Sequence, residues 1–90
     1  MKNLSSTLFL LFISAIAFAQ SFDSAIYRFN KGMEEKNARR FLVAAGHFND
    51  AIQLNPSYTE AYLENGLVNK EMRRTDAAKE NFLKAYGLDN

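Results

Sequence analysis

The stretch GMEEKNARRFLVAAGHFNDAIQLNP, residues 32–56, is matched 34 positions later by GLVNKEMRRTDAAKENFLKAYGLDN, residues 66–90. Eight residues are identical between the two stretches, and the register does not slip. The identical pairs are Gly32/Gly66, Lys36/Lys70, Arg39/Arg73, Arg40/Arg74, Ala44/Ala78, Phe48/Phe82, Ala51/Ala85 and Leu54/Leu88. A fixed period of this length is typical of proteins built from stacked copies of one supersecondary unit.

The first unit is predicted to fold as two helices joined by a turn at residues 37–40. Its first helix, with Asp23 as the predicted N-cap, has apolar residues at spacings of three and four, the period of one helix face. These residues are Ile26, Phe29 and Met33. The second helix carries one apolar face, formed by Phe41, Ala44, Phe48, Ala51 and Ile52. This helix is expected to end before Pro56, because proline cannot continue a helix.

The second unit is predicted to begin with a capping box, because Ser57 is followed three residues later by Glu60. Apolar residues again mark the inner faces of two helices. They are Tyr62, Leu63 and Leu67 in the first helix and Ala78, Phe82 and Ala85 in the second. We expect the small residues to let the two helices of each unit approach closely. Gly32 would face Ala44 and Gly66 would face Ala78, with the phenylalanines filling the space beside them.

This pattern resembles the tetratricopeptide repeat, a family with a 34-residue period. The positions that carry the resemblance are Gly32, Ala44, Phe48, Ala51 and Pro56 in the first copy and Gly66, Ala78, Phe82 and Ala85 in the second. The resemblance implies an all-α fold of two tandem helix-turn-helix repeats, a short α-solenoid. The expected boundaries are residues 25–58 for the first repeat and residues 59–90 for the second.

Several positions depart from the family pattern. Lys31 and Asn65 replace the usual leucine before the glycine, and Glu35 and Asn69 replace the usual aromatic three residues after it. The turn glycine is an arginine in both copies, and Asn90 stands where the second closing proline is expected. These departures concern how tightly each repeat packs rather than which fold it adopts.

Residues 1–19 are predicted to be a secretory signal peptide. Lys2 is followed by an uncharged apolar run from Leu8 to Phe18, and Ala17 and Ala19 form an A-x-A-like cleavage site. The apolar run is shorter than the roughly 20 residues that span a bilayer, although an uncleaved membrane anchor is the alternative interpretation. Cleavage would leave residues 20–24 as a lead-in to the repeats. The protein is therefore expected to be exported, to a bacterial periplasm or outside the cell.

The composition of the exported part excludes some classes of partner. Without Lys2, ten of the eleven basic side chains remain and balance ten acidic ones, so no net charge favours nucleic acid or an anionic membrane. The chain has no cysteine, and an exported domain of this size usually depends on disulfides. Its small core is therefore expected to pack against more protein.

No catalytic, cofactor-binding or metal site is predicted. His47 could meet Asp50, three residues further along the same helix, but no nucleophile or further metal-ligand residue accompanies them. His47 aligns with Asn81 in the second copy, which indicates an unspecialised polar position. The two Arg-Arg pairs are expected at one edge of the stack. There they would either meet an acidic partner or stabilise helix ends through the helix dipole.

The predicted function is protein binding. In tetratricopeptide proteins the first helix of each repeat lines a concave groove, and the resemblance carries that role to ten positions here. They are Ile26, Phe29, Met33, Lys36, Asn37, Glu60, Leu63, Leu67, Lys70 and Glu71. Such a face, apolar at its centre and charged at one end, suits an amphipathic helix or an apolar peptide.

Alternatives to a binding groove remain open from the sequence. The same apolar stripe could pack against another repeat or a second copy of the protein. Helical repeats normally need three or more copies, so Phe82, Leu83, Tyr86 and Leu88 are expected to lack a covering helix. Self-association, a partner protein, or a longer repeat array would each cover them. The chain is thus predicted to be a non-catalytic protein-interaction module, alternatively a structural subunit, or thirdly the docking front of a longer enzyme.

Overall fold

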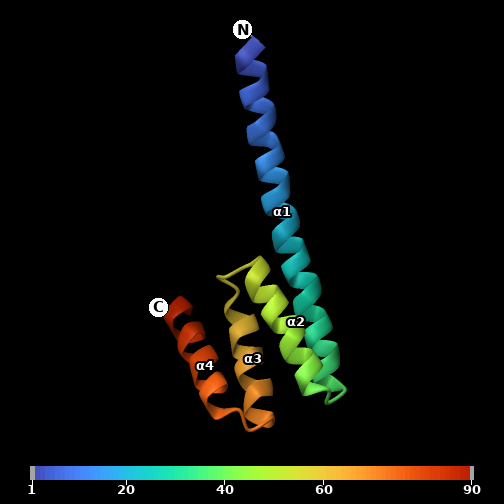
Figure 1. Ribbon diagram of the computed structural model, residues 1–90, viewed down its shortest axis with the longest axis vertical. Helices are drawn as coiled ribbons and strands as arrows, with labels where there is room; N and C mark the ends of the chain where they lie inside the picture. Colours follow the sequence, from blue (N-terminus) through green and yellow to red (C-terminus); the bar gives the residue numbers. More distant parts are fainter. Residues whose placement is uncertain (1, 90) are drawn as a thin grey trace.

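The computed structural model describes the backbone of residues 2–89 and the side chains of residues 20–88. This part of the chain is all-helical and contains no strand. Its four helices are α1 (Lys2–Asn37), α2 (Phe41–Leu54), α3 (Thr59–Glu71) and α4 (Thr75–Asp89). They lie side by side in chain order, each antiparallel to the one before it and packed against it (Figure 1). The all-α prediction is confirmed.

The turns from α1 to α2 and from α3 to α4 have the same geometry. Arg39 and Arg73 adopt left-handed backbone conformations, with φ angles of 62° and 61°. Arg40 N–H donates to the Glu35 carbonyl at 2.9 Å, and Arg74 N–H donates to the Asn69 carbonyl at 2.8 Å. The bond from a residue to the fifth residue before it is the helix-ending Schellman motif, in which the left-handed position favours glycine. A side chain there costs about 1–2 kcal/mol.

The glycines identified in the sequence contact aromatic rings in both helix pairs. A Cβ atom added at Gly32 would lie 2.5 Å from Phe48 Cε1, and one added at Gly66 would lie 2.5 Å from Phe82 Cε1. The residue nearest to each glycine is thus the phenylalanine, not the alanine that was expected to face it. The ring of the phenylalanine itself lies against the glycine and occupies the space that a side chain would need.

The core joins the two helix pairs. Ala44, Ala45 and Phe48 of α2 form a buried cluster with Val68 of α3. Four half-buried side chains pack against this cluster, namely Phe29, Met33, Phe41 and Met72. Because Val68 is fully buried by a face of α2, α3 covers the first helix pair.

Two asparagines on the inner face of α3 are buried with their hydrogen bonds satisfied. Asn65 Nδ2 donates to Asn49 Oδ1 at 2.7 Å. Asn69 Nδ2 donates to the Asn65 carbonyl oxygen at 2.8 Å and lies 2.9 Å from Asn65 Oδ1. These are the two α3 positions where the sequence departs from the usual leucine and aromatic. The amide network makes the buried polar groups tolerable there, because each donor has an acceptor.

The predicted helix starts are wrong at two positions. Asp23 lies inside α1, because the helix extends through it without interruption. Ser57 is not the N-cap of α3, since Tyr58 holds that position and no side chain caps the helix. The Ser57 N–H instead donates to Asn55 Oδ1 at 3.1 Å. With this local Asx turn, α3 starts one residue later than the predicted capping box would place it.

The predicted signal peptide, residues 1–19, lies outside the part of the chain whose side chains are described. In the described remainder, residues 20–88, no helix has the length and apolar character needed to cross a membrane.

Candidate protein-binding surfaces

Two of the ten predicted groove residues lie largely within the core. Phe29 is half-buried, with its ring stacked on Tyr58 at a centroid distance of 5.0 Å and tilted against Phe48 at 5.6 Å. Burial beside this ring raises the pKa of Tyr58. Met33 is also half-buried and packs on the cluster around Phe48. Both side chains therefore hold α1 against the helices that follow it.

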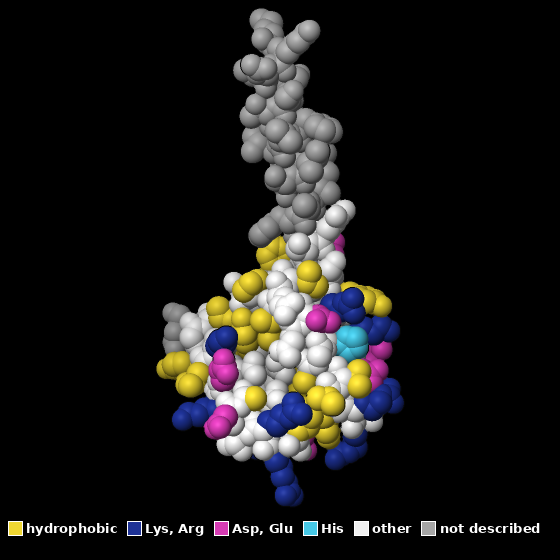
Figure 2. Space-filling model, viewed as in Figure 1, with side chains coloured by type: hydrophobic (Ala, Val, Ile, Leu, Met, Phe, Trp, Pro, Cys, Tyr) yellow, Lys and Arg dark blue, Asp and Glu magenta, His cyan; other side chains and the backbone are white. Residues whose placement is uncertain are grey.

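Three other predicted groove residues are apolar and exposed. Ile26 of α1 is 49% exposed, and Leu63 and Leu67 of α3 are 43% and 38% exposed. The two leucines are four residues apart, so they lie on the same face of α3. Figure 2 shows hydrophobic, basic and acidic side chains interspersed over the face in view. The exposed leucines are available to a partner without any loss of core packing.

The remaining predicted groove residues are polar. Lys36 of α1 forms an ion pair with Glu64 of α3, which links the side chains of these two helices. Asn37, at the end of α1, is exposed, as are three charged residues of α3, namely Glu60, Lys70 and Glu71. Lys36 is therefore engaged within the fold, whereas the other four are on the surface.

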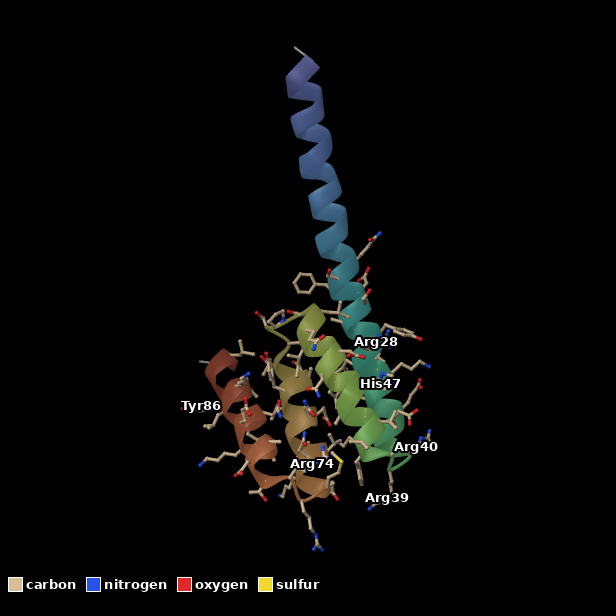
Figure 3. All side chains as sticks on the ribbon, viewed as in Figure 1. Arg28, Arg39, Arg40, His47, Arg74 and Tyr86 are labelled. Carbon is tan, nitrogen blue, oxygen red and sulfur yellow. The ribbon has the colours of Figure 1, made fainter. Side chains whose placement is uncertain are left out.

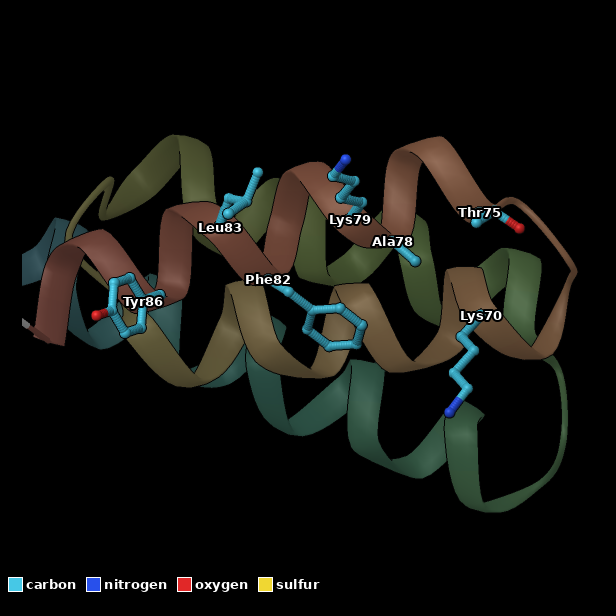
Figure 4. Close-up of a pocket in the computed structure, with 7 residues that line it drawn as sticks. All are labelled: Lys70, Thr75, Ala78, Lys79, Phe82, Leu83 and Tyr86. Atoms are coloured by element: carbon cyan, nitrogen blue, oxygen red, sulfur yellow. The ribbon is translucent and has the colours of Figure 1, made fainter.

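A hollow with a volume of about 670 Å³ lies on α3 and α4. Its lining residues are Lys70, Thr75, Ala78, Lys79, Phe82, Leu83 and Tyr86. In Figure 4 the Phe82 side chain points from α4 toward α3. Leu83 and Tyr86 are 60% and 70% exposed. Of the four residues expected to lack a covering helix, Phe82, Leu83 and Tyr86 line this surface, which we name the end-face hollow. Leu88 is 42% exposed and lies outside it.

The end-face hollow combines an apolar floor with positive charge. Lys70 comes from α3 and Lys79 from α4, and its lining includes no acidic residue. Of the residues that line the hollow, only Lys70 is also one of the ten predicted groove residues. The sequence analysis did not single out Lys79 or Thr75, although the 34-residue register pairs them with Ala45 and Phe41 in the core of the first helix pair.

His47 does not form a catalytic or metal-binding arrangement with the residues described around it. It is half-buried, and its Nδ1 atom is buried without a hydrogen-bond partner among them. Asp50 is exposed. Figure 3 shows His47 on the side of the molecule that also carries Arg28 and Arg40. Within the described residues no group of three or more His, Cys, Asp or Glu side chains could hold a metal ion.

The arginine pairs take part in the helix-ending turns. Arg40 donates a hydrogen bond from Nε to the Glu35 carboxylate. This bond lowers the pKa of Glu35 and raises that of Arg40. The Arg39 guanidinium lies 5.2 Å from the centre of the Phe41 ring, within the range of a cation–π contact. All four arginines are exposed, and the two turns that carry them lie at the same end of the molecule (Figure 1).

The chain is similar to a protein of an archaeon. The chain is 30% identical over 70 residues to "Uncharacterized protein MJ0572" of Methanocaldococcus jannaschii, an alignment that covers 78% of this chain and 81% of that protein. The chain belongs to the same family as this archaeal protein. No protein-family model matches the chain, and no solved structure matches it. The name of the archaeal relative states no activity.

Proposed function

We propose that the chain is a tetratricopeptide-like protein that binds a partner protein and catalyses no reaction. The observation that carries this proposal is the agreement between the two helix pairs at an offset of 34 residues. Both have a left-handed arginine at the turn and a phenylalanine ring on a glycine at the same distance. Shared geometry at each repeat position supports two tandem copies of one unit, which form a short α-solenoid.

The proposed binding groove is lined by the first helix of each repeat. Ile26, Leu63 and Leu67 supply exposed apolar surface, while exposed polar and charged residues lie at the ends of α1 and α3. An amphipathic helix or an apolar peptide matches this combination, because its apolar side would cover the leucines and its polar side would meet the charges. Phe29 and Met33 would support the groove from beneath rather than contact the ligand.

Export follows from the proposed signal peptide at residues 1–19. Its basic start, apolar middle and small residues at the cleavage site support secretion. We therefore place the binding module in a bacterial cell envelope, in the periplasm or outside the cell. The partner would be a protein of the same compartment.

Replacing Leu63 and Leu67 together with glutamate is expected to abolish partner binding while the fold is kept. Covering a leucine side chain stabilises a complex by about 1.5 kcal/mol or more, so the double variant should bind at least about tenfold more weakly. The measurement is the amount of partner that a tagged chain recovers from a cell-envelope extract. Both side chains are exposed, so helix content by circular dichroism should not change.

The matched control is a double replacement of Leu42 and Val43 with glutamate. These residues are 62% and 49% exposed on α2, outside the proposed groove, and their replacement should leave recovery unchanged. Equal recovery with the α3 variant and the unaltered chain would remove the groove from the proposal. Equal loss with both variants would show that added negative charge, rather than the groove, controls binding.

A further inference from the structure

The end-face hollow corresponds, residue by residue, to the surface of the first helix pair that α3 covers. Subtracting 34 from each lining residue gives Lys36, Phe41, Ala44, Ala45, Phe48, Asn49 and Ile52. In the first helix pair, Ala44, Ala45 and Phe48 pack on Val68 of α3. Lysine, alanine and phenylalanine are identical at three of the seven aligned positions, which are covered by a helix in the first pair and border the hollow in the second.

The way α3 contacts the first helix pair shows what this surface recognises. Glu64 forms an ion pair with Lys36, and Val68, four residues later, is fully buried in the cluster with Phe48. Met72, four residues further, packs on the same cluster. An acidic residue and two apolar residues, spaced four positions apart, lie along one face of a helix. This is the pattern that holds α3 in place.

We propose that the end-face hollow binds an acidic amphipathic helix of another protein, seated as α3 is seated on the first helix pair. Its acid meets Lys70, the counterpart of Lys36. An apolar residue four positions later covers Phe82, the counterpart of Phe48. This site is separate from the proposed groove, apart from the shared Lys70, and its test does not depend on that groove.

Two differences between the covered and exposed surfaces define the ligand more closely. Lys79 replaces Ala45, so the hollow has a second positive charge where the first helix pair is apolar. Leu83 replaces Asn49, whose Oδ1 accepts a hydrogen bond from Asn65 of α3. The ligand helix should therefore be more acidic than α3, and it should carry an apolar residue where α3 carries Asn65.

Charge argues against a second copy of this chain as the occupant. Two end faces packed on each other would bring Lys70 and Lys79 of both copies into one interface, where like charges repel. Packing α1 of a second copy on the hollow is also unfavourable. The α1 residue that corresponds to Val68 is Glu34, and it would bury a carboxylate against Phe82.

A synthetic peptide of residues 57–72 tests the proposal, because it contains Glu64, Val68 and Met72. Titrated into the full 90-residue chain, it should shift the NMR signals of Phe82, Leu83 and Tyr86. The expected Kd is on the order of 10⁻⁴ M, since an isolated helix of this length is marginal in water and is ordered on binding. The Asn65→Leu peptide should bind about fivefold more tightly, because its leucine meets Leu83.

Variants of the protein give the matched controls. Leu83→Glu should weaken binding about tenfold, whereas Leu42→Glu, at almost the same exposure on another helix, should leave Kd unchanged. The Glu64→Lys peptide should bind about threefold more weakly to the unaltered chain and regain affinity for Lys70→Glu. If the Glu64→Lys peptide binds Lys70→Glu no more tightly than it binds the unaltered chain, the proposed register is wrong.

Two results would overturn the proposal. One is a titration in which neither peptide shifts the signals of the hollow. The other is sedimentation of the full chain as a dimer that Leu83→Glu dissociates, because a second copy would then be the occupant.

Discussion

Replacing Phe48 with alanine should lower the free energy of unfolding by about 3–5 kcal/mol, the range for a fully buried phenylalanine. The Phe48 side chain has no exposed surface. It fills the space between Gly32 of α1 and Val68 of α3, so its loss leaves a cavity between three helices. Because small domains are stable by only about 5–15 kcal/mol, this variant should unfold at a much lower urea concentration. Urea unfolding followed by circular dichroism measures the change.

The equivalent replacement of Phe82 is the matched control for Phe48. Phe82 rests on Gly66 with the same geometry, but it is only half-buried and borders the end-face hollow. Its loss should cost about 1–2 kcal/mol, because less surface is buried and water can fill the space. If both variants lose the same free energy of unfolding, the two rings are equally covered, and the end face is not exposed as described.

Replacing Gly32 with alanine is expected to destabilise the protein by about 1–3 kcal/mol, the usual cost of overpacking. The new Cβ would lie 2.5 Å from the Phe48 ring, and Phe48 is enclosed by α3 and cannot move away freely. This clash outweighs the gain of up to about 1 kcal/mol that alanine brings to a helix. Thermal unfolding of the variant, followed by circular dichroism, measures the balance.

Two other glycines in the chain are controls for Gly32. Gly66→Ala makes the same close contact, but the Phe82 ring can shift toward the end-face hollow, so the loss should be smaller by about 1 kcal/mol or more. Gly46 is exposed on α2 with nothing within 4 Å of an added Cβ. Gly46→Ala should therefore stabilise the protein by about 0.5–1 kcal/mol. A destabilised Gly46→Ala would refute the reasoning for all three positions.

Much of the fold could be predicted from residue types and their spacing. The turn at residues 37–40, the end of α2 before Pro56 and the all-helical character were predicted in this way. These features depend on local residue types, namely proline, glycine and the spacing of apolar positions, which act within a few residues of the chain.

Other features, some local to the turns and some set by packing between helices, could not be predicted. The start of α3 is set by Asn55, whose side chain accepts the Ser57 N–H and displaces the predicted capping box. The left-handed arginines hold a conformation that sequence preference assigns to glycine. For the candidate site, the helical stripe placed Phe29 and Leu63 at equivalent positions. Only packing separates the half-buried Phe29, which stacks on Tyr58, from the exposed Leu63.

Site-specific photo-crosslinking in the cell tests the central claim most directly. A photoreactive phenylalanine at position 63 lies in the proposed groove, and one at position 42 lies outside it on a more exposed site. We predict a discrete crosslinked product at position 63 that contains a different, exported protein, and no such product at position 42. Two results would contradict the claim that this protein is a partner-binding module. One is a product at position 63 that contains only a second copy of the chain, and the other is no more product at position 63 than at position 42.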